Sequence, residues 1–327
     1  MAVRINPSRI LLWRNPTDLQ LGITAPVVIE NVSPEQERLL SLLERGIADE
    51  SVVAADRDLI DRIAPALLDS SRITKPTLSG DFVRGAFAEL IRASFATNQD
   101  GLAVLENRAK TTLKLDSLSL GGLLTALGLA AAGVGRILTT DRALVGEHDV
   151  GPIGYPTEAL NRSRVDTVNE ILANRPGSTR VFDFESQTPA RRRHSLSVIT
   201  SQNALLPSSY RGLQTSKTPH LAVLFGSEWV SVSPKIVGTP CLGCLDLHAV
   251  DADPLWPVLA SQLVGRADYL EDARSALFAA SMAIGEILRA IDSPSQESEF
   301  VGHRLKVDSG RVETWTWPAH SECDCVP

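Results

Sequence analysis

The four cysteines of this 327-residue chain fall in two tight pairs, Cys241 with Cys244 and Cys323 with Cys325. Two close pairs that lie far apart in sequence are the usual layout of a four-thiolate zinc site, because zinc takes four ligands at the corners of a tetrahedron. Such a site has no open coordination position, so its role would be structural. It would tie the end of the chain back to residue 241 and close a loop of about eighty residues.

A redox-active Cys-x-x-Cys motif and disulfide bonds are the alternative interpretations of these pairs. A reducing cytoplasm disfavours structural disulfides, and no thioredoxin-like sequence surrounds the first pair. His248 and His320 lie close by and are possible replacement ligands, although we expect them to be ordinary histidines near the surface. We therefore predict a structural Zn²⁺ held by Cys241, Cys244, Cys323 and Cys325.

Composition and charge exclude several classes of protein. Hydrophobic residues make up 43% of the chain and charged residues 22%, as in a globular domain, and the net charge is −7. A general nucleic-acid partner would need a basic face to replace phosphate counterions. No apolar run reaches the roughly eighteen residues that span a membrane, and no signal-peptide pattern occurs at the N-terminus. We expect a cytoplasmic protein with neither nucleic-acid nor membrane partners.

Residues 1–75 are predicted to form a winged-helix-like module. A three-stranded meander is indicated by three apolar runs between turn-forming residues, namely Arg9–Arg14, Leu19–Ile23 and Val27–Ile29. Ser33 begins a helix with a capping box, and two more helical segments are expected at about residues 49–56 and 58–68. The acidic residues of these helices argue against DNA, the usual partner of a winged helix.

The rest of the chain is predicted to be a helical linker, residues 76–110, followed by an α/β domain, residues 111–327. The linker contains a helical pattern at 82–95. A strand, a small-residue helix and a second strand that ends in an acid begin a doubly wound parallel sheet. Strands are expected at 113–120, 135–141, 180–184, 195–200 and 221–225, helices at 121–132, 164–174, 252–264 and 272–291, and a β-hairpin at 300–317.

Several segments resemble a known family. Ala130–Ile137, with Asp141 at the end of the next strand, resembles the ThiF/MoeB family, the ubiquitin-activating-enzyme-like adenylyltransferases. Thr239–His248 and Asp251–Pro257, with His320–Cys325, resemble more specifically the ThiF-like proteins of clusters that make ribosomally synthesised, modified peptides (RiPPs). Those proteins bind leader peptides as partners of YcaO cyclodehydratases, which form azoline heterocycles. The N-terminal segment is similar to the RiPP recognition element, a winged-helix domain that docks leader peptides.

The phosphate-binding turn departs from the family pattern. An active member cradles ATP on a glycine-rich turn between the first strand and helix. Here two adjacent glycines remain late in the turn, Leu118 and Leu120 stand where phosphates should sit, and Asp116 adds like charge. The strand that ends at Thr200 runs into Ser201, Gln202 and Asn203, so no carboxylate stands directly after it to hold magnesium. We therefore predict a pseudo-adenylyltransferase for which ATP is not expected, with Asp141 a nucleotide ligand only if the protein is active.

The resemblance implies a non-catalytic scaffold that presents a precursor peptide to a YcaO-type cyclodehydratase. The leader would add a strand to the edge of the N-terminal sheet and fill a groove against the third helix. The leader-binding residues predicted on this basis are Val27, Val28, Ile29, Leu59, Ile60 and Ile63, all of which also suit plain core packing. Holding the peptide near its partner enzyme would raise its effective concentration there.

Two other functions remain open. The chain could be an active ATP-dependent adenylyltransferase acting on a peptide, with Asp141 on the ribose and Arg136 or Arg164 on the phosphates. It could also be a winged-helix transcription factor with a sensor domain, which the acidic helices disfavour. A homodimer is expected by analogy with the α/β domain of relatives.

Overall fold

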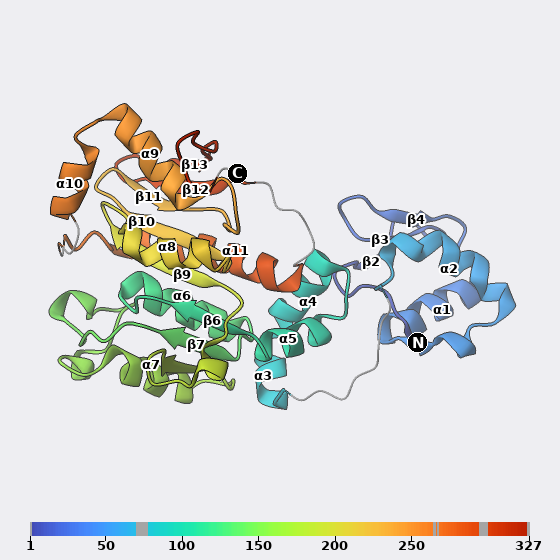
Figure 1. Ribbon diagram of the computed structural model, residues 1–327. Coiled ribbons are helices and arrows are strands. Elements are labelled where there is room, and N and C mark those ends of the chain that lie inside the picture. The colour runs from blue at the N-terminus through green and yellow to red at the C-terminus, as the bar shows by residue number, and fades with distance from the viewer. Residues whose placement is uncertain (1, 70–77, 264–265, 267, 294–299, 326–327) are drawn as a thin grey trace. The chain divides into compact units, whose positions relative to one another are not determined.

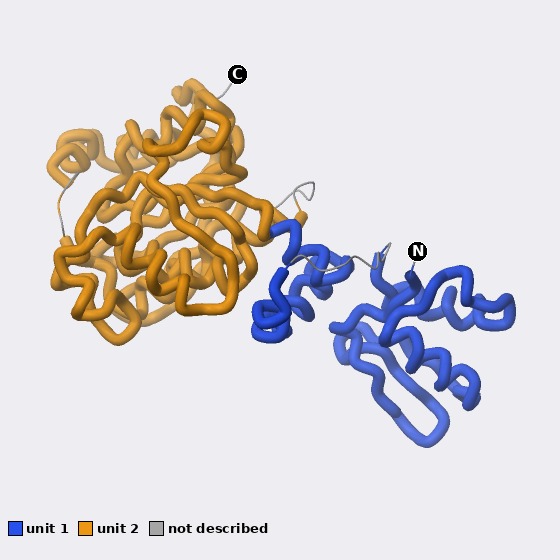
Figure 2. The backbone as a smooth tube through the Cα atoms, turned by 90° about the horizontal axis from the view of Figure 1, so that it is seen from below, with its two compact units in different colours: residues 1–108 blue, residues 109–327 orange. Residues whose placement is uncertain are grey.

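The computed structural model describes residues 2–69, 78–263, 266, 268–293 and 300–325. The chain divides into two compact units, residues 1–108 and 109–327 (Figure 2). The predicted boundary at residues 75–76 lies outside the described residues. None of the helices in the described ranges is long and apolar enough to cross a membrane.

The first unit begins with short strands, and the predicted three-stranded meander is confirmed. Strands β2 (Leu11–Trp13), β3 (Leu19–Leu21) and β4 (Val27–Ile29) form an antiparallel sheet in that order. A separate pair joins β1 (Ala2–Val3) to β5 (Ile47–Ala48). Side chains alternate along a strand, so one face of the meander enters the core while the other faces water.

Helices follow the meander. Helix α1 (Pro34–Arg45) begins after Ser33 with the predicted capping box and ends at Gly46, whose φ of 86° favours glycine. The segment predicted as a helix at 49–56 is instead two 3₁₀ turns, η1 (Asp49–Ser51) and η2 (Ala54–Asp56). The extended backbone of Val52 and Val53 separates the turns, as β-branched residues favour.

The next helices are shorter than predicted. Helix α2 (Arg57–Ile63) passes into the 3₁₀ turn η3 (Ala64–Ala66), because Pro65 lacks the N–H that would continue the α-helix. The helix predicted at 82–95 is broken at Ala86, whose backbone leaves helical geometry. Helices α3 (Gly80–Gly85) and α4 (Phe87–Thr97) take its place, and α5 (Gly101–Ala109) follows. The three helices share a small apolar core.

The second unit is built on an eight-stranded sheet (Figure 1). Its five parallel strands are β6 (Thr112–Leu115), β7 (Arg136–Thr139), β8 (Arg180–Asp183), β9 (Ser197–Gln202) and β10 (His220–Phe225). They lie in the order β8-β7-β6-β9-β10, which confirms the doubly wound sheet. The order reverses between β6 and β9, so ligands are expected at the carboxyl ends of these two strands.

Three antiparallel strands extend the sheet beyond β10. They are β11 (Trp229–Val232), β12 (Gly302–Lys306) and β13 (Val312–Trp315). The last two form the predicted hairpin, paired from Gly302 with Trp315 to Leu305 with Val312. Strand β11, which pairs with β10 and β12, was not predicted from the sequence.

Helices cover both faces of the sheet. One face packs against α6 (Leu120–Ala131), α7 (Arg164–Ala173) and α11 (Ala273–Asp292), and the other against α8 (Pro207–Thr215) and α9 (Leu242–Ala252). Val198 points into the first core and Ile199 into the second, as strand alternation requires. Short 3₁₀ turns η4 (Glu147–Asp149), η5 (Thr157–Ala159) and η6 (Pro189–Arg192) lie in the connections.

The region after α9 corrects one expectation. A single helix was predicted at 252–264, of which residue 264 lies outside the described residues. Instead α9 ends at Ala252 and a new helix, α10 (Trp256–Leu263), begins four residues later. Pro254 lies between them and cannot continue a helix, because it has no N–H to donate.

Candidate functional site

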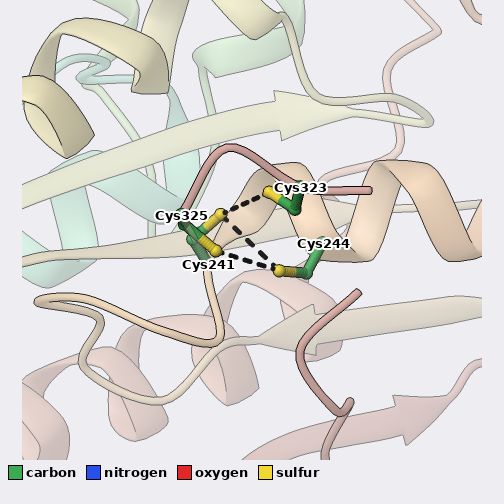
Figure 3. Close-up of side chains that lie close together, drawn as sticks. All are labelled: Cys241, Cys244, Cys323 and Cys325. Atoms are coloured by element: carbon green, nitrogen blue, oxygen red, sulfur yellow. Dashed lines mark hydrogen bonds between the residues drawn. The ribbon is translucent and has the colours of Figure 1, made fainter. Parts of the chain in front are cut away.

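The four cysteines, far apart in sequence, converge on one point (Figure 3). The Sγ atom of Cys241 lies 3.8 Å from that of Cys244 and 3.6 Å from that of Cys323, and Cys244 lies 3.3 Å from Cys325. All four sulfurs lie within 4.8 Å of one another. Zinc–sulfur bonds of about 2.3 Å place tetrahedral ligands roughly 3.8 Å apart. The spacing therefore fits a tetrahedral metal ion such as zinc.

The two pairs come from different parts of the second unit. Cys241 immediately precedes α9 and Cys244 lies in its first turn, whereas the other pair lies in the tail after β13. Two hydrogen bonds fix the pairs to each other: Trp317 Nε1 donates to the carbonyl of Cys241 at 2.9 Å, and the Thr239 hydroxyl donates to the carbonyl of Cys325 at 2.5 Å. The tail is thus anchored beside α9.

The turn between the first two cysteines does not require a glycine at position 243. A Cβ atom at Gly243 would lie 3.4 Å from the sulfurs of Cys241 and Cys323, which is ordinary van der Waals contact. The φ of Gly243 is also not positive. The turn is closed by the start of α9, with Cys241 in extended geometry as its N-cap.

The thiols differ in acidity. Withdrawal from water raises the pKa of Cys241 and of Cys323. The same desolvation acts on Cys244, but hydrogen bonds from the backbone of Cys241 and His320 outweigh it and lower the pKa of Cys244 to about 7. A thiolate is the form that binds metal, so the lowered pKa of Cys244 favours it as a ligand.

A second cluster lies beside the cysteines and is held by hydrogen bonds. Ligand atoms of His248, Asp251 and His320 lie within 4.8 Å of one another. His320 Nδ1 accepts the N–H of Glu322 at 3.1 Å, so its Nε2 carries the proton toward Asp251 at 3.0 Å. His248 Nε2 faces the Pro318 carbonyl at 3.0 Å and is likewise a donor. These histidines lie outside the four-cysteine group and tie α9 to the tail.

A cavity of about 380 Å³ opens at the switch point of the sheet. Ser117 and Ser119, after β6, and Thr200, at the end of β9, line it together with Glu271. This is the position at which the doubly wound fold places its ligands.

Asp141 lies after β7, and its carboxylate bonds to other groups of the chain. Its carboxylate accepts the N–H of Leu118 at 2.6 Å and the N–H of Ala143 at 2.7 Å, and it pairs with Arg164 at 3.1 Å. Arg164 in turn bonds both carboxylate oxygens of Asp149. The side chain of Asp141 is only 5% exposed. Its hydrogen-bonding capacity is therefore largely used before any ligand arrives.

The two arginines considered for phosphates are also occupied. Arg164 is the buried partner of two carboxylates. Arg136 packs its guanidinium over the ring of Phe182 at 4.2 Å and donates to Gln187 at 2.7 Å. Neither arginine lies as a free cation in the cavity.

The turn between β6 and α6, the predicted position of a phosphate-binding motif, makes contacts that the sequence did not reveal. Leu118 is completely buried in the core, so it does not fill the cavity as expected, whereas Leu120 lines the cavity. The carboxylate of Glu271 accepts the N–H of Gly121 at 2.8 Å, in the first turn of α6. A helix N-terminus is where this type of fold binds phosphate, so a carboxylate of the chain takes that place.

Asp116, in the same turn between β6 and α6, bonds to strand β9. Its carboxylate oxygens accept the N–H of Thr200 at 2.9 and 3.1 Å, which links the β6–α6 loop to β9. Withdrawal from water raises the pKa of Asp116 to about 7, although the Thr200 hydrogen bonds and Lys114 oppose the rise.

The predicted leader-binding residues divide between core and surface. Ile29, Leu59, Ile60 and Ile63 are buried in the core of the N-terminal module. Val28 is 40% exposed and Val27 is partly buried. Two exposed residues of β2, Leu12 and Trp13, were not predicted as site residues. Leu12 lies opposite Gln20 and Gln20 opposite Val28, so they share one sheet face.

No protein-family model and no curated protein matches this sequence. Solved structures do match. E. coli MccB with ATP has a TM-score of 0.68 at 11% identity over 99% of both chains. The chain has a ThiF-like fold. MccB with AMPCPP and MccA gives 0.68 at 10% identity over 99% of both chains. PaaA gives 0.60 at 16% identity over 83% of this chain and 98% of its own.

Proposed function

We propose that this ThiF-like chain is a non-catalytic scaffold that binds the leader of a RiPP precursor peptide and presents it to a YcaO-type cyclodehydratase. MccB, a microcin C7 biosynthetic enzyme of the same fold, has been crystallised with MccA, which supports a peptide as the partner. The sequence resemblance to ThiF-like proteins of RiPP clusters supports the cyclodehydratase as the second partner.

The observation that carries the non-catalytic assignment is that charged groups at the switch point already bond within the chain. Glu271 holds the N-terminus of α6, and Asp141 is bonded to Arg164 and the backbone. A triphosphate placed there would meet two carboxylates and displace a buried ion pair. Breaking such a pair costs about 3–5 kcal/mol, because it leaves a buried charge uncompensated.

The N-terminal module supplies the proposed peptide site. Strand β4 has no strand neighbour on its outer side among the described residues, so an extended leader can add beside it through main-chain hydrogen bonds. Val27 and Val28 would lie next to the added strand, and Leu12, which shares the sheet face of Val28, extends the apolar surface on that face. Ile29, Leu59, Ile60 and Ile63 would support this edge from the core. This assignment makes the module a winged-helix-like RiPP recognition element.

The four cysteines are proposed to bind a structural Zn²⁺. Cys241, Cys244, Cys323 and Cys325 supply four thiolates, which leaves no open position for a substrate. When bound, zinc would contribute a cross-link between α9 and the tail and no reaction step.

Calorimetry on the full-length chain tests the proposal. The probes are Mg-ATP and a synthetic leader from a precursor peptide encoded next to a YcaO-type gene. We expect saturable leader binding, weakened by Val28→Asp, and no heat from Mg-ATP. Gln36→Ala, in the capping box on α1, is the control for general damage to the module. Absence of leader binding overturns the scaffold assignment. Light scattering on the same sample tests the proposed homodimer.

An active ATP-dependent adenylyltransferase of the ThiF/MoeB type is the alternative. The match to ATP-bound MccB over 99% of both chains favours it. Micromolar Mg-ATP binding, or pyrophosphate exchange that depends on the peptide, would establish it in place of the scaffold.

A further inference from the structure

The side-chain amide nitrogen of Gln214 is buried and has no hydrogen-bond partner. Gln214 lies in the last turn of α8. Among the described residues, only Arg136 Nε and His220 Nε2 share this condition. Leaving a buried donor unsatisfied costs about 1–3 kcal/mol, so such a donor in a native fold needs an explanation, for example a bound ion that completes the site.

The unpaired amide lies beside the cysteine cluster. A Cβ atom built on Gly243 would lie 3.8 Å from the Gln214 amide nitrogen and 3.4 Å from the sulfurs of both Cys241 and Cys323. The amide and these two sulfurs therefore surround one point. Gln214 also lines the same cavity of about 940 Å³ as Cys241, Cys323 and Cys325.

Metal binding changes what these sulfurs can accept. A neutral thiol is a weak acceptor, whereas a metal-bound thiolate carries negative charge and accepts strongly. Four thiolates around a divalent ion leave a net charge of −2, which further donors stabilise. A side-chain amide presents two N–H groups, one for each of two neighbouring sulfurs.

We propose that Gln214 is a positioning residue whose side-chain amide donates hydrogen bonds to the metal-bound thiolates of Cys241 and Cys323. The inference rests on the proposed metal site and is independent of the peptide-binding function. Residues that hold metal ligands by hydrogen bonds typically change metal affinity 10- to 100-fold when replaced. Gln214 would therefore increase metal retention without touching the ion.

The test uses the full-length protein with Co²⁺ and Zn²⁺ as probes. Gln214→Leu removes the donor, and Gln214→Glu keeps the shape but replaces the amide with a carboxylate. We expect both variants to bind one ion, to lose it to a competing chelator at about 10-fold lower chelator concentration, and to show a shifted sulfur-to-cobalt charge-transfer band. The Glu variant should lose more affinity, because its charge repels the thiolates.

Thr215→Val is the matched control. Thr215 lies next to Gln214 on α8 and lines the same cavity, but its hydroxyl bonds the carbonyl of Arg211 on its own helix. This variant should keep wild-type affinity and the wild-type band. Wild-type metal affinity and an unshifted band in both Gln214 variants would refute the role of Gln214. Failure of the wild-type protein to bind either ion would refute the metal site itself, whatever the peptide measurements show.

Discussion

The switch-point cavity and the cysteine cluster lie in the same unit and differ in how their polar groups are satisfied. Arg164 and Glu271, which line the cavity, bond to groups of the chain itself, and so does Asp141, the partner of Arg164. In the cluster, four free thiols face one another and the amide of Gln214 has no partner. The cluster therefore keeps unused bonding capacity, whereas the charged groups at the cavity use theirs within the chain.

This difference bears on how a fold should be related to a function. The carboxyl ends of β6 and β9 are where a doubly wound sheet binds its ligand, and the ATP-bound relative shares the fold. The side chains at that position decide whether a ligand can still enter. Here those side chains already bond to other groups of the chain.

Removing a cysteine should produce the largest effect. Cys244→Ser takes away one of four ligands, so bound metal should be lost together with several kcal/mol of unfolding free energy. Metal analysis and urea unfolding of the purified protein measure both quantities. Equal stability of the wild-type protein with and without chelator would remove the contrast between the two sites.

Breaking the buried ion pair should have the second-largest effect on stability. Arg164→Ala leaves the carboxylates of Asp141 and Asp149 without their cation and should lower unfolding free energy by about 3–5 kcal/mol. Arg162→Ala is the matched control, because its pair with Glu170 is exposed and such pairs contribute little. Similar unfolding midpoints for the two variants would show that the Arg164 network does not stabilise the fold.

Asp116 should make the stability of the protein depend on pH. Burial raises its folded pKa to about 7, above the ordinary value of 3.8 for this carboxyl group, so the native state binds the proton more tightly than the unfolded state. Stability from this group is therefore present at low pH and falls as pH rises toward about 7. Asp116→Asn should abolish this component, and its unfolding free energy relative to wild type should rise over that range by up to a few kcal/mol. A difference that is constant with pH would contradict the assignment.

Removing the Glu271 carboxylate, which bonds the start of α6, should have the smallest effect on stability. Glu271→Ala loses the hydrogen bond to Gly121 N–H, which is worth about 1 kcal/mol in thermal unfolding. We expect no gain of Mg-ATP binding by calorimetry, because Asp141 stays paired with Arg164. Micromolar ATP binding by this variant would show that Glu271 alone closes the cavity.

Much of the fold was predictable because its signals are local. The capping box at Ser33 depends on residues three positions apart, and strand alternation at Leu19 and Leu21 depends on nearest neighbours. The errors occurred where short-range patterns compete. Pro65 ended α2 early, and Pro254 kept the helix predicted from residue 252 from starting before Trp256.

The candidate metal site was predictable from residue type and spacing, since four cysteines in two pairs suit one tetrahedral ion. The leader-binding residues were harder to assign. An apolar residue on a short strand or helix has the same sequence signature whether it faces a core or a ligand. Burial of Leu59, Ile60 and Ile63 and exposure of Val28 and Trp13 emerged only from packing.

The sequence by itself determined the positions of the cysteines, the meander and the alternation of strands and helices, because these depend on spacing over a few residues. Only the tertiary structure decided that Glu271 meets Gly121, 150 residues away, and that Leu118 turns into the core. It also showed that Asp141 is held by Arg164 and that Gln214 lies beside the sulfurs. Such contacts are selected by the packing of whole elements, which no local pattern encodes.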